Sequence, residues 1–587
     1  MTDRFRRPAA FAAAPYAVFA ILAAVSWNRW IEPFVDSGRE LMVPWRLAHG
    51  ERLYRDVAFY HGPLGPWLAA LADLLAGRSL SARILLSAAV GLLHLEGLRR
   101  LARAIASERR AALAVSLVVA LTAFLRPGGW LFPFSLDASI AVATVTWSLV
   151  LLTGEHARRR DAVAGVFLAL ALLSRVELGG LGVVAAVLAA RRSPRRWVAL
   201  AAWPCLAAAV GYAIASRGTP LSTLVSSGWL AVVKPPEAFR TVYRAYAGLD
   251  QPGLRLAELG LASIVLLGVG ALLALGSRAA GPNRIGSIVA TATVSLTLAA
   301  LAWTCLRPPE QFEGTLALLP PLVRIVPPLV LGLAAVRIGR ALARRPPAPL
   351  PEIPIAVLLV AAFFALRLFL AAGYSGPYNA YFLPLPALLA VVAALGLADR
   401  AAAQLGPLLP GLAAQALAVF LLFRIASLAD IYRQAGWTPV ASPAGSVTLL
   451  EPAAGATHLA LEDLSRRIPA GGSLVGFPEG GFFNYVLGAR SPLREEQFFP
   501  GRLDAEAEKR VARGIEEDPP DAVLVANVLA VGEGARAFGK DYLIELGTTV
   551  QRRFRVAAAF GPGAGPSAAV GDPQFFVEIR VPRRRAP

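Results

Sequence analysis

The sequence is poor in charge and almost free of cysteine. Only 17% of its 587 residues are charged while 56% are hydrophobic, and the mean hydropathy of +0.56 is too high for an ordinary soluble protein of this size. The two cysteines, Cys205 and Cys305, both lie inside apolar runs, which argues against a disulfide framework and against a cysteine metal site. Neither an internal repeat nor a low-complexity linker is visible in the sequence. The low fraction of charged residues and the high mean hydropathy favour a bilayer as the solvent of this chain.

Long apolar runs occupy the first three quarters of the sequence. Because a backbone in hydrocarbon must satisfy its own polar groups, continuous runs of about 20 apolar residues predict helices. We therefore expect a polytopic α-helical membrane protein with about 13 transmembrane helices. The expected spans cover residues 11–27, 80–98, 111–125, 136–153, 162–174, 177–190, 197–215, 257–276, 285–305, 314–336, 353–372, 382–398 and 408–428.

The basic excess of the chain is concentrated in short loops. The sequence has 58 basic and 39 acidic residues, a net charge of +19. Arginines gather between apolar runs, as in residues 99–110, 158–160 and 191–196, and the positive-inside rule places such loops in the cytoplasm. No nucleic-acid motif accompanies them, so no nucleic-acid partner is expected. This pattern predicts a multi-pass protein of the bacterial cytoplasmic (inner) membrane with its N-terminus inside.

The sequence changes character near residue 430. We expect a transmembrane domain over 1–430, with a long first outer loop over 28–77, and an extracytoplasmic domain over 431–587. In this second part, strand-like and helix-like stretches alternate, which predicts a soluble α/β domain. The strand-like stretches are 471–478, 521–526, 556–560 and 575–581, and the helix-like stretches are 457–467 and 503–517.

The first outer loop holds the most informative carboxylate. Asp36 lies just beyond the first expected span, in the stretch Asp36-Ser-Gly-Arg-Glu40. A carboxylate at a membrane boundary can be tuned by desolvation and by nearby arginines for work as a general base. The same stretch is also typical of a helix start, in which Asp36 is the N-cap of a helix over 41–47. Both roles of Asp36 are open at this point.

Other charged residues of the outer segments are candidates for the same site. The candidate supporting acids are Glu40, Asp56 and Asp137. Basic residues of the same outer regions are Arg175, Lys234, Arg240, Arg244 and Arg307. No two of the polar residues His49, Asp56 and His61 are spaced as a ligand pair on a helix face, so we expect no structural metal and no cofactor, while a divalent ion is left open.

Several of these residues also have ordinary structural interpretations. Asp137 opens an expected span and is well placed as a helix N-cap. Arg175 and Glu177 break an apolar double span and can form an internal ion pair, although ionisable groups at membrane depth often mark a functional site. Lys234 is a rare lysine in a chain that otherwise uses arginine, and it can be a solvated loop charge. In the C-terminal part, Glu479 lies in a glycine-rich turn, and the closure of a loop explains these glycines.

The first outer loop resembles that of the lipid-dependent glycosyltransferases of the C superfamily, which include protein O-mannosyltransferases and aminoarabinose transferases. The shared features are one span, Asp36 in the first outer loop, the stretch Gly50-Glu-Arg-Leu-Tyr-Arg-Asp56, then Gly62-Pro63, many further spans and an outer C-terminal domain. Ser37 stands where these families usually have a second acid, so Glu40 is the candidate for that acid. The resemblance covers the whole architecture and is specific for the superfamily rather than for a substrate.

This resemblance implies an enzyme that moves a hexosyl or pentosyl group from a polyprenyl-phosphate sugar donor to a glycan, lipid or protein acceptor. Asp36 would deprotonate the acceptor hydroxyl in an inverting reaction, and the turn with Glu479 would contact the acceptor. Basic side chains would stabilise the departing lipid phosphate, and arginine suits this role because its planar fork can donate two hydrogen bonds to one phosphate. The candidates for this phosphate binding are Arg175, Lys234, Arg240, Arg244 and Arg307. Two other classes of protein fit the number of expected spans: a transporter or lipid flippase, which charges such as Arg175 within apolar runs also suit, and a non-enzymatic envelope assembly factor.

Overall fold

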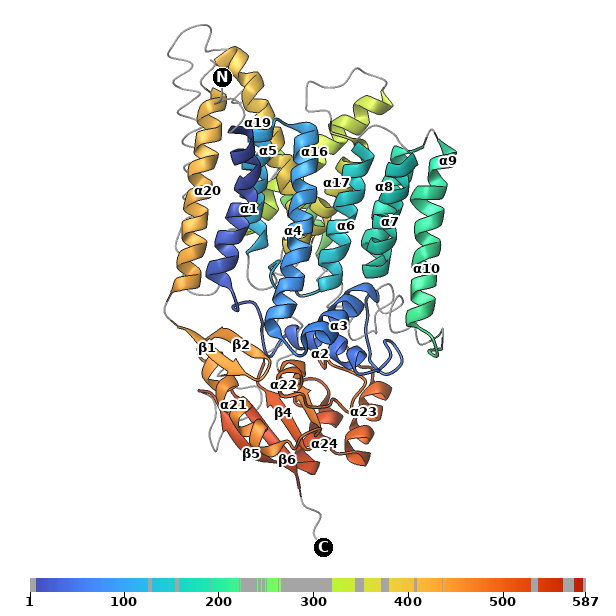
Figure 1. Cartoon of the computed structure of the whole chain (residues 1–587), viewed down its shortest axis with the longest axis vertical. Helices are drawn as coiled ribbons and strands as arrows, with labels where there is room; N and C mark the ends of the chain where they lie inside the picture. Colours follow the sequence, from blue (N-terminus) through green and yellow to red (C-terminus); the bar gives the residue numbers. More distant parts are fainter. Residues whose placement is uncertain are drawn as a thin grey trace.

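The computed structural model places a bundle of helices against a smaller mixed domain (Figure 1). It describes residues 7–124, 129–153, 158–191, 193–220, 222, 240, 244, 249, 251–261, 263–264, 319–343, 353–370, 379–405, 409–434, 436–528, 537–562 and 575–583. The expected span over 285–305 lies outside these residues, as does most of the span over 257–276.

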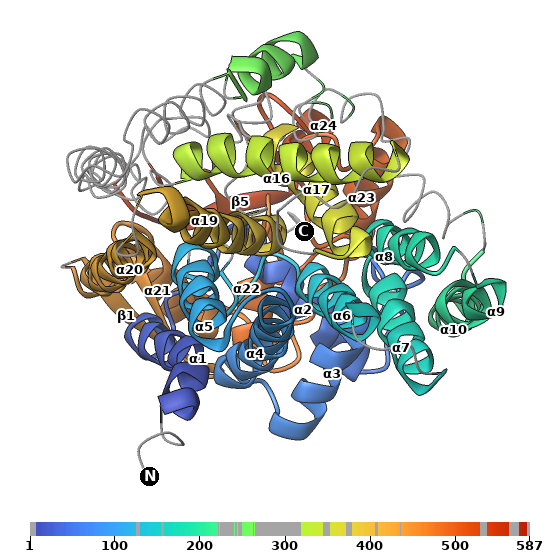
Figure 2. The ribbon, with the colours of Figure 1, turned by 90° about the horizontal axis from the view of Figure 1, so that it is seen from above.

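The bundle is built from the apolar runs. Its longer helices are α1 (Arg7–Ser26), α4 (Leu80–Ile105), α5 (Glu108–Val118), α6 (Leu136–Thr153), α7 (Arg158–Ser174), α8 (Val176–Ala189), α10 (Trp203–Ala215), α16 (Leu319–Leu342), α17 (Ile355–Leu370), α19 (Pro384–Leu405) and α20 (Leu409–Arg433). Shorter pieces are the π-helices Val119–Ala123 and Val198–Ala202, together with α9 (Pro194–Trp197) and α18 (Asn379–Phe382). Seen from above, α9 and α10 form one edge of the bundle and α20 the opposite edge (Figure 2).

Four helical segments of the described chain are long and apolar enough to cross a membrane: Leu80–Ile105, Leu136–Thr153, Pro194–Ala215 and Ala413–Arg433. Shorter apolar helices accompany them, among them Phe11–Ser26, Val176–Ala189 and Ile355–Leu370. A mostly helical chain with a small C-terminal sheet is therefore confirmed. The number of about 13 transmembrane helices stays a prediction.

The first outer loop is more ordered than the sequence analysis expected. It contains two helices, α2 (Ser37–Ala48) and α3 (Leu64–Ala76), which lie between the bundle and the C-terminal domain (Figure 1). Most of α2 is buried, including the charged side chains of Arg39 and Arg46. This helix is thus the physical link between the two parts of the molecule.

The C-terminal part is a mixed α/β domain, as the sequence predicts. A four-stranded sheet has the order β3 (Leu474–Phe477), β4 (Ala522–Ala526), β6 (Val577–Pro582), β5 (Phe554–Phe560), in which β3 and β4 are parallel and the other neighbours antiparallel. Four helices accompany it: α21 (Ala453–Arg467), α22 (Gly481–Leu487), α23 (Ala505–Glu517) and α24 (Ile544–Arg553). An antiparallel hairpin, β1 (Trp437–Ser442) and β2 (Gly445–Leu450), joins the domain to α20. The four strand-like stretches thus correspond to β3, β4, β5 and β6.

Two glycines allow α2 and α22 to approach closely. A Cβ atom on Gly38 would lie 2.9 Å from the backbone nitrogen of Gly481, and a Cβ atom on Gly481 would lie 2.7 Å from the carbonyl oxygen of Gly38. Real Cβ atoms do not approach backbone atoms this closely. The contact between the first outer loop and the C-terminal domain therefore depends on the absence of side chains at both positions.

We expect the variant Gly481→Ala to destabilise this contact. The added methyl group meets backbone rather than a flexible side chain, and overpacking of this kind costs about 1–3 kcal/mol. The matched control is Gly514→Ala in α23, where the new Cβ would meet only Leu493 Cδ2 at 3.9 Å. Alanine is favoured over glycine inside a helix by about 0.5–1 kcal/mol, so the control should be neutral or stabilising. Thermal unfolding of the purified full chain measures both; equal midpoints for the two variants would refute the close-contact argument.

Candidate active site

Asp36 precedes the first turn of α2 but does not cap it. It occupies the N-cap position with φ +60°, and its side chain makes no capping hydrogen bond. A positive φ is uncommon outside glycine, and Asp and Asn are among the residues that tolerate it. The carboxylate of Asp36 therefore does not act as a local helix cap. Its side chain is half-buried and directed to other partners.

Glu479 of the C-terminal domain caps α2 instead. The backbone N–H of Asp36 donates to Glu479 Oε2 at 2.6 Å, and the N–H of Arg39 donates to Oε1 at 2.8 Å. These are the two N–H groups that a local capping box would satisfy. Here one carboxylate, 440 positions away from Arg39 along the chain, accepts both hydrogen bonds. Glu479 is fully buried, and its carboxyl group lies at the positive end of the helix dipole.

Gln497 connects the two carboxylates. Its Nε2 donates to Asp36 Oδ1 at 3.0 Å and to Glu479 Oε2 at 3.1 Å, while its Oε1 accepts from Arg39 at 3.1 Å. Gln497 is almost fully buried, so these contacts hold the Asp36 carboxylate in one orientation. Within the described part of the chain, Asp36 Oδ2 accepts no hydrogen bond. This second oxygen is the one available to take a proton.

Arg39 is a buried cation that joins three parts of the site. One amino group donates to Gln497, and the other donates to Glu40 Oε1 and to the carbonyl of Phe134, both at 3.0 Å. Burial alone would lower the pKa of Arg39, but the carboxylates of Glu40, Asp36 and Glu479 outweigh it and raise the pKa. The guanidinium is therefore permanently charged and fixed in place.

Glu40 and Arg175 attach to the segment that leads into α6. Glu40 Oε2 accepts from the N–H of Leu136 at 3.1 Å, beyond its ion pair with Arg39. Arg175 donates to the hydroxyl of Ser135 at 3.1 Å and to Glu177 at 3.2 Å. The structure therefore brings these two candidates to one segment. The ion pair of Arg175 with Glu177 that the sequence suggests is present as well.

Asp137 holds the first outer loop to the bundle. Its Oδ1 accepts from the N–H of Gly65 at 2.8 Å, and a Cβ atom on Gly65 would lie only 2.4 Å from that oxygen. Nearby, the N–H of Gly62 donates to the carbonyl of Ser174 at 2.9 Å. Asp137 is fully buried and starts the first turn of α6. These contacts give the acid a structural role between α3 and α6.

The remaining candidates lie elsewhere. Asp56 bonds the side chain of Arg55 and the N–H of Arg52 in an exposed turn, away from the contacts of Asp36. Arg240 and Arg244 are exposed helical residues. Lys234 and Arg307 lie outside the described residues. Among the residues that the structure describes, no group of three or more His, Cys, Asp or Glu could hold a metal ion.

Three arginines act electrostatically on His61. Burial, followed by the charges of Arg175, Arg39 and Arg502, holds the pKa of His61 well below its usual range. The guanidinium of Arg502 also stacks over the ring of Tyr60, 5.1 Å from its centroid. The lowered pKa favours the neutral form of His61, so the positive charge at this place comes from the three arginines. We define Arg39, Arg175 and Arg502 as the arginine cluster.

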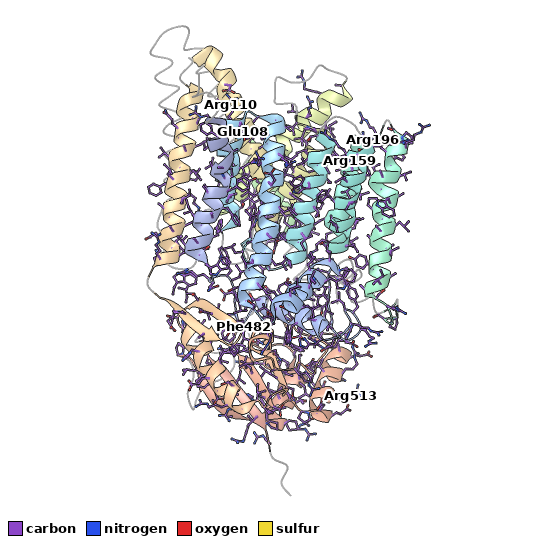
Figure 3. The ribbon with its side chains drawn as sticks, viewed as in Figure 1. Glu108, Arg110, Arg159, Arg196, Phe482 and Arg513 are labelled. Carbon is purple, nitrogen blue, oxygen red and sulfur yellow. The ribbon has the colours of Figure 1, made fainter. Side chains whose placement is uncertain are left out.

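Sequence reasoning missed the contributions of Arg39, Gln497 and Arg502, and left the role of Glu479 open. All are polar side chains whose partners come from distant segments, so no local pattern identifies them. The glycines around Glu479 are the only sequence signal, since they mark a turn where another backbone can approach. Figure 3 shows the neighbouring Phe482, on α22, at the level where the domain meets the bundle.

The titration of Glu479 predicts a pH dependence of stability. Burial and the nearby Asp36 carboxylate raise the pKa of Glu479 from 4.5 to about 7. Between these values the native chain holds a proton that the unfolded chain has lost, so stability falls as the pH rises from about 4.5 to 7. His61 has the opposite slope, because its lowered pKa makes stability fall as the pH drops below 6.5.

The comparison of wild type with Glu479→Gln isolates the first effect. The melting temperature of the wild type should decline, relative to that of the variant, as the pH rises from 4.5 to 7. The arginine and histidine groups are the same in both proteins and cancel in the difference. A difference in melting temperature between the two proteins that stays constant from pH 4.5 to 7 would contradict a raised pKa at Glu479.

The chain matches one family model and several solved structures. Residues 60–218 match the family model of dolichyl-phosphate-mannose-protein mannosyltransferases. This range includes His61, Asp137 and Arg175 and begins after Asp36. We find no match to the sequence among curated proteins.

Two solved structures are similar over most of the chain. ArnT from Cupriavidus metallidurans bound to undecaprenyl phosphate is 15% identical, with 97% of each chain covered and a TM-score of 0.43. The archaeal oligosaccharyltransferase AglB from Archaeoglobus fulgidus, in complex with an inhibitory peptide and a dolichol-phosphate, is 13% identical, with 96% of this chain and 74% of that chain covered and a TM-score of 0.44. The family match over residues 60–218 agrees with the resemblance to the lipid-dependent glycosyltransferases of the C superfamily that the sequence shows.

Proposed function

We propose that this chain is a membrane glycosyltransferase that moves a sugar from a polyprenyl-phosphate-linked donor to an acceptor at the membrane surface. The observation that carries the proposal is the state of Asp36: its carboxylate does not cap α2, is oriented by Gln497 through one oxygen, and lies beside the buried cation Arg39. The match to a family described by a lipid-phosphate sugar donor supports the donor class.

The proposed reaction is a single displacement with inversion. Asp36 takes the proton of an acceptor hydroxyl, the resulting oxygen attacks the anomeric carbon of the sugar, and the bond from that carbon to the phosphate oxygen breaks. The electron pair of that bond goes to the lipid phosphate, which leaves without protonation. One base and a source of positive charge are therefore sufficient for the chemistry.

Arg175 and Arg502 of the arginine cluster are the proposed source of that charge. Arg175 and Arg502 are only partly buried, so their guanidinium groups can reach a phosphate that enters from the membrane. Arg39 is buried among its partners and acts as a positioning residue for Gln497 and Glu40. In this assignment Glu40 and Asp137 are structural acids rather than second bases.

The proposed setting is the bacterial cytoplasmic membrane. The arginine-rich end of α4 and the first turns of α5 and α7 lie opposite the C-terminal domain (Figure 1), as Arg110 and Arg159 do in Figure 3. The positive-inside rule assigns that end to the cytoplasm. The domain over 431–587, the site at Asp36 and the first outer loop over 28–77 are then extracytoplasmic. A lipid-borne donor and a water-borne acceptor can meet there.

The experiment that tests this function compares the envelope of a strain lacking the protein with that of its parent. We expect one glycan, lipid or protein of the envelope to lack a sugar, and a polyprenyl-phosphate sugar to accumulate, because the donor is no longer consumed. Mass spectrometry of both fractions identifies the sugar and the acceptor together. An unchanged envelope with an unchanged pool of lipid-linked sugars would overturn the proposal.

A further inference from the structure

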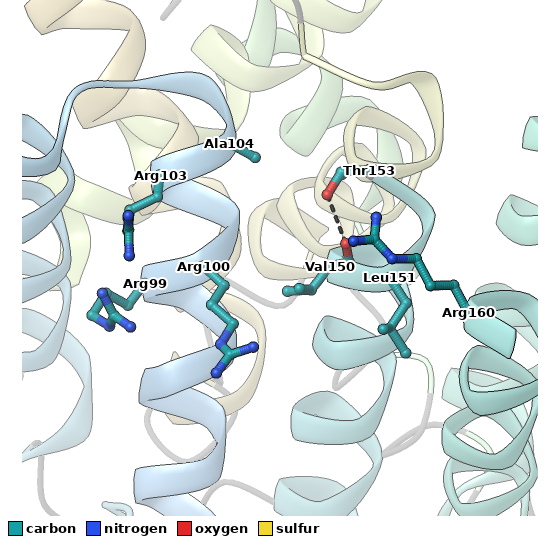
Figure 4. A pocket seen from close by; sticks show the side chains of 8 residues that line it. All are labelled: Arg99, Arg100, Arg103, Ala104, Val150, Leu151, Thr153 and Arg160. Atoms are coloured by element: carbon teal, nitrogen blue, oxygen red, sulfur yellow. Dashed lines mark hydrogen bonds between the residues drawn. The ribbon is translucent and has the colours of Figure 1, made fainter. Parts of the chain in front are cut away.

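A basic pocket lies at the end of the bundle opposite the C-terminal domain, far from Asp36. It has a volume of about 600 Å³ and lies between α4, α6 and α7. Its lining residues are Arg99, Arg100, Arg103, Ala104, Val150, Leu151, Thr153 and Arg160. In Figure 4, Arg100 from α4 and Arg160 from α7 extend toward the space between their helices. The proposed reaction uses none of these residues.

The arginines of α4 outnumber the carboxylates that they contact. Glu96 pairs with Arg99 at 2.7 Å and with Arg100 at 2.6 Å, and Glu108 pairs with Arg99 at 3.5 Å and with Arg103 at 2.6 Å. Within the described chain, three guanidinium groups therefore share two carboxylates. This part of the pocket has an excess of positive charge that an anion can neutralise.

Two of these arginines are suited to bind a further anion. Arg100 and Arg103 make their ion pairs through Nε, and their side chains are 52% and 53% exposed. The terminal amino groups of both side chains are additional donors in a planar fork. Such a fork can donate two parallel hydrogen bonds to two oxygens of one phosphate, which a monatomic anion cannot accept.

One wall of the pocket is apolar and continues along the bundle. Ala104, Val150 and Leu151 line it, and the guanidinium of Arg100 lies 4.9 Å from the centroid of the Trp147 ring. Trp147 in turn stacks on Phe167 of α7 at 5.8 Å. An apolar surface that continues from a cationic rim is complementary to a molecule with an anionic head and a hydrocarbon tail.

We propose that this pocket binds the phosphate group of an anionic phospholipid, with an acyl chain lying along Trp147 and Phe167. Basic pockets between transmembrane helices on the cytoplasmic side are a known physical solution for such head groups. This site is distinct from the proposed donor site, because it lies at the other end of the bundle. The inference therefore stands whether or not the proposed glycosyl transfer is correct.

The test uses the purified full chain in a neutral detergent. Its melting temperature, and lipid binding by native mass spectrometry, are measured with phosphatidylglycerol, with phosphatidylcholine, and with inorganic phosphate at equal concentrations. The double variant Arg100→Gln/Arg103→Gln removes the proposed phosphate donors. The matched control is Arg158→Gln/Arg159→Gln, which removes the same charge from exposed positions at the start of α7 that do not line the pocket.

We expect phosphatidylglycerol to bind and to raise the melting temperature, phosphatidylcholine and inorganic phosphate to have much weaker effects, and the pocket variant to bind phosphatidylglycerol at least about tenfold more weakly than the control variant. Equal binding of both phospholipids, equal losses in the two variants, or an equal effect of inorganic phosphate would overturn the assignment. If the pocket variant is too unstable to purify, the milder Arg103→Lys, which keeps the charge but loses the fork, gives the same readout.

Discussion

The variant Asp36→Asn should transfer sugar at least about a hundredfold more slowly than the wild type, the usual scale for the loss of a general base. Asparagine keeps the shape of the side chain, tolerates the positive φ at this position, and retains an oxygen that can accept the hydrogen bond from Gln497. Because Glu479, and not Asp36, caps α2, the variant should fold with almost unchanged stability. The measurement is the initial rate of transfer from a labelled polyprenyl-phosphate sugar, with protein amounts matched in membranes.

The matched control for this result is Asp56→Asn. Asp56 is an acid of the same outer loop, and its carboxylate is satisfied by Arg55 and by a local N–H. Its loss should leave the transfer rate almost unchanged, because Asp56 contacts none of the partners of Asp36 and a surface ion pair contributes only about 0–1 kcal/mol to stability. Normal transfer by a well-expressed Asp36→Asn protein would refute the assignment of Asp36 as the general base. A similar loss in both variants would show that the loop, rather than Asp36, limits the rate.

The variant Glu479→Ala should weaken both stability and transfer. It leaves the N–H groups of Asp36 and Arg39 without their acceptor, and each buried donor without a partner costs about 1–3 kcal/mol. The expected loss is therefore about 2–6 kcal/mol in the free energy of unfolding. Transfer should fall as well, because Gln497 loses one of the contacts that orient it toward Asp36.

Two control variants show whether the stability lost in Glu479→Ala comes from the missing hydrogen bonds. Glu479→Gln keeps one acceptor oxygen and should lose less stability than Glu479→Ala. Glu545→Ala removes an exposed acid from the first turn of α24 in the same domain, and a surface change of this kind should stay within about 0.5 kcal/mol. Chemical unfolding of the full chain, followed by the fluorescence of its tryptophans, measures all three variants. A Glu479→Ala protein as stable as the Glu545→Ala protein would contradict the capping of α2 across the domain boundary.

Hydrophobic runs allowed much of the helical architecture to be predicted. The expected span over 136–153 has the bounds of α6, and that over 177–190 differs from α8 by one residue at each end. Local apolar composition decides these helices, so distant contacts have little influence on them. The helix α3 was missed because its residues were assigned to a loop, although leucines at 68, 71 and 75 follow a helical spacing.

The candidate site could be predicted only in part. Asp36, Glu40 and Arg175 are unusual for their position in an apolar chain, and composition alone singles them out. The partner of Asp36 could not be found in this way, because the local pattern Asp-Ser-Gly-Arg-Glu predicts self-capping of the helix. The structure shows that a carboxylate from the C-terminal domain replaces that local cap. Such a replacement depends on the crossing of α2 and α22, and no single-segment pattern encodes it.

One measurement tests the central claim most directly, because it separates glycosyl transfer from the transport of a lipid-linked sugar across the membrane. The purified chain is reconstituted into liposomes that contain a polyprenyl-phosphate sugar with a labelled sugar, together with an envelope extract as the acceptor. The account predicts that free polyprenyl phosphate appears in step with label on the acceptor, and that Asp36→Asn suppresses both. Label that crosses the bilayer while still attached to the lipid, with no polyprenyl phosphate released, would contradict the account and favour a flippase.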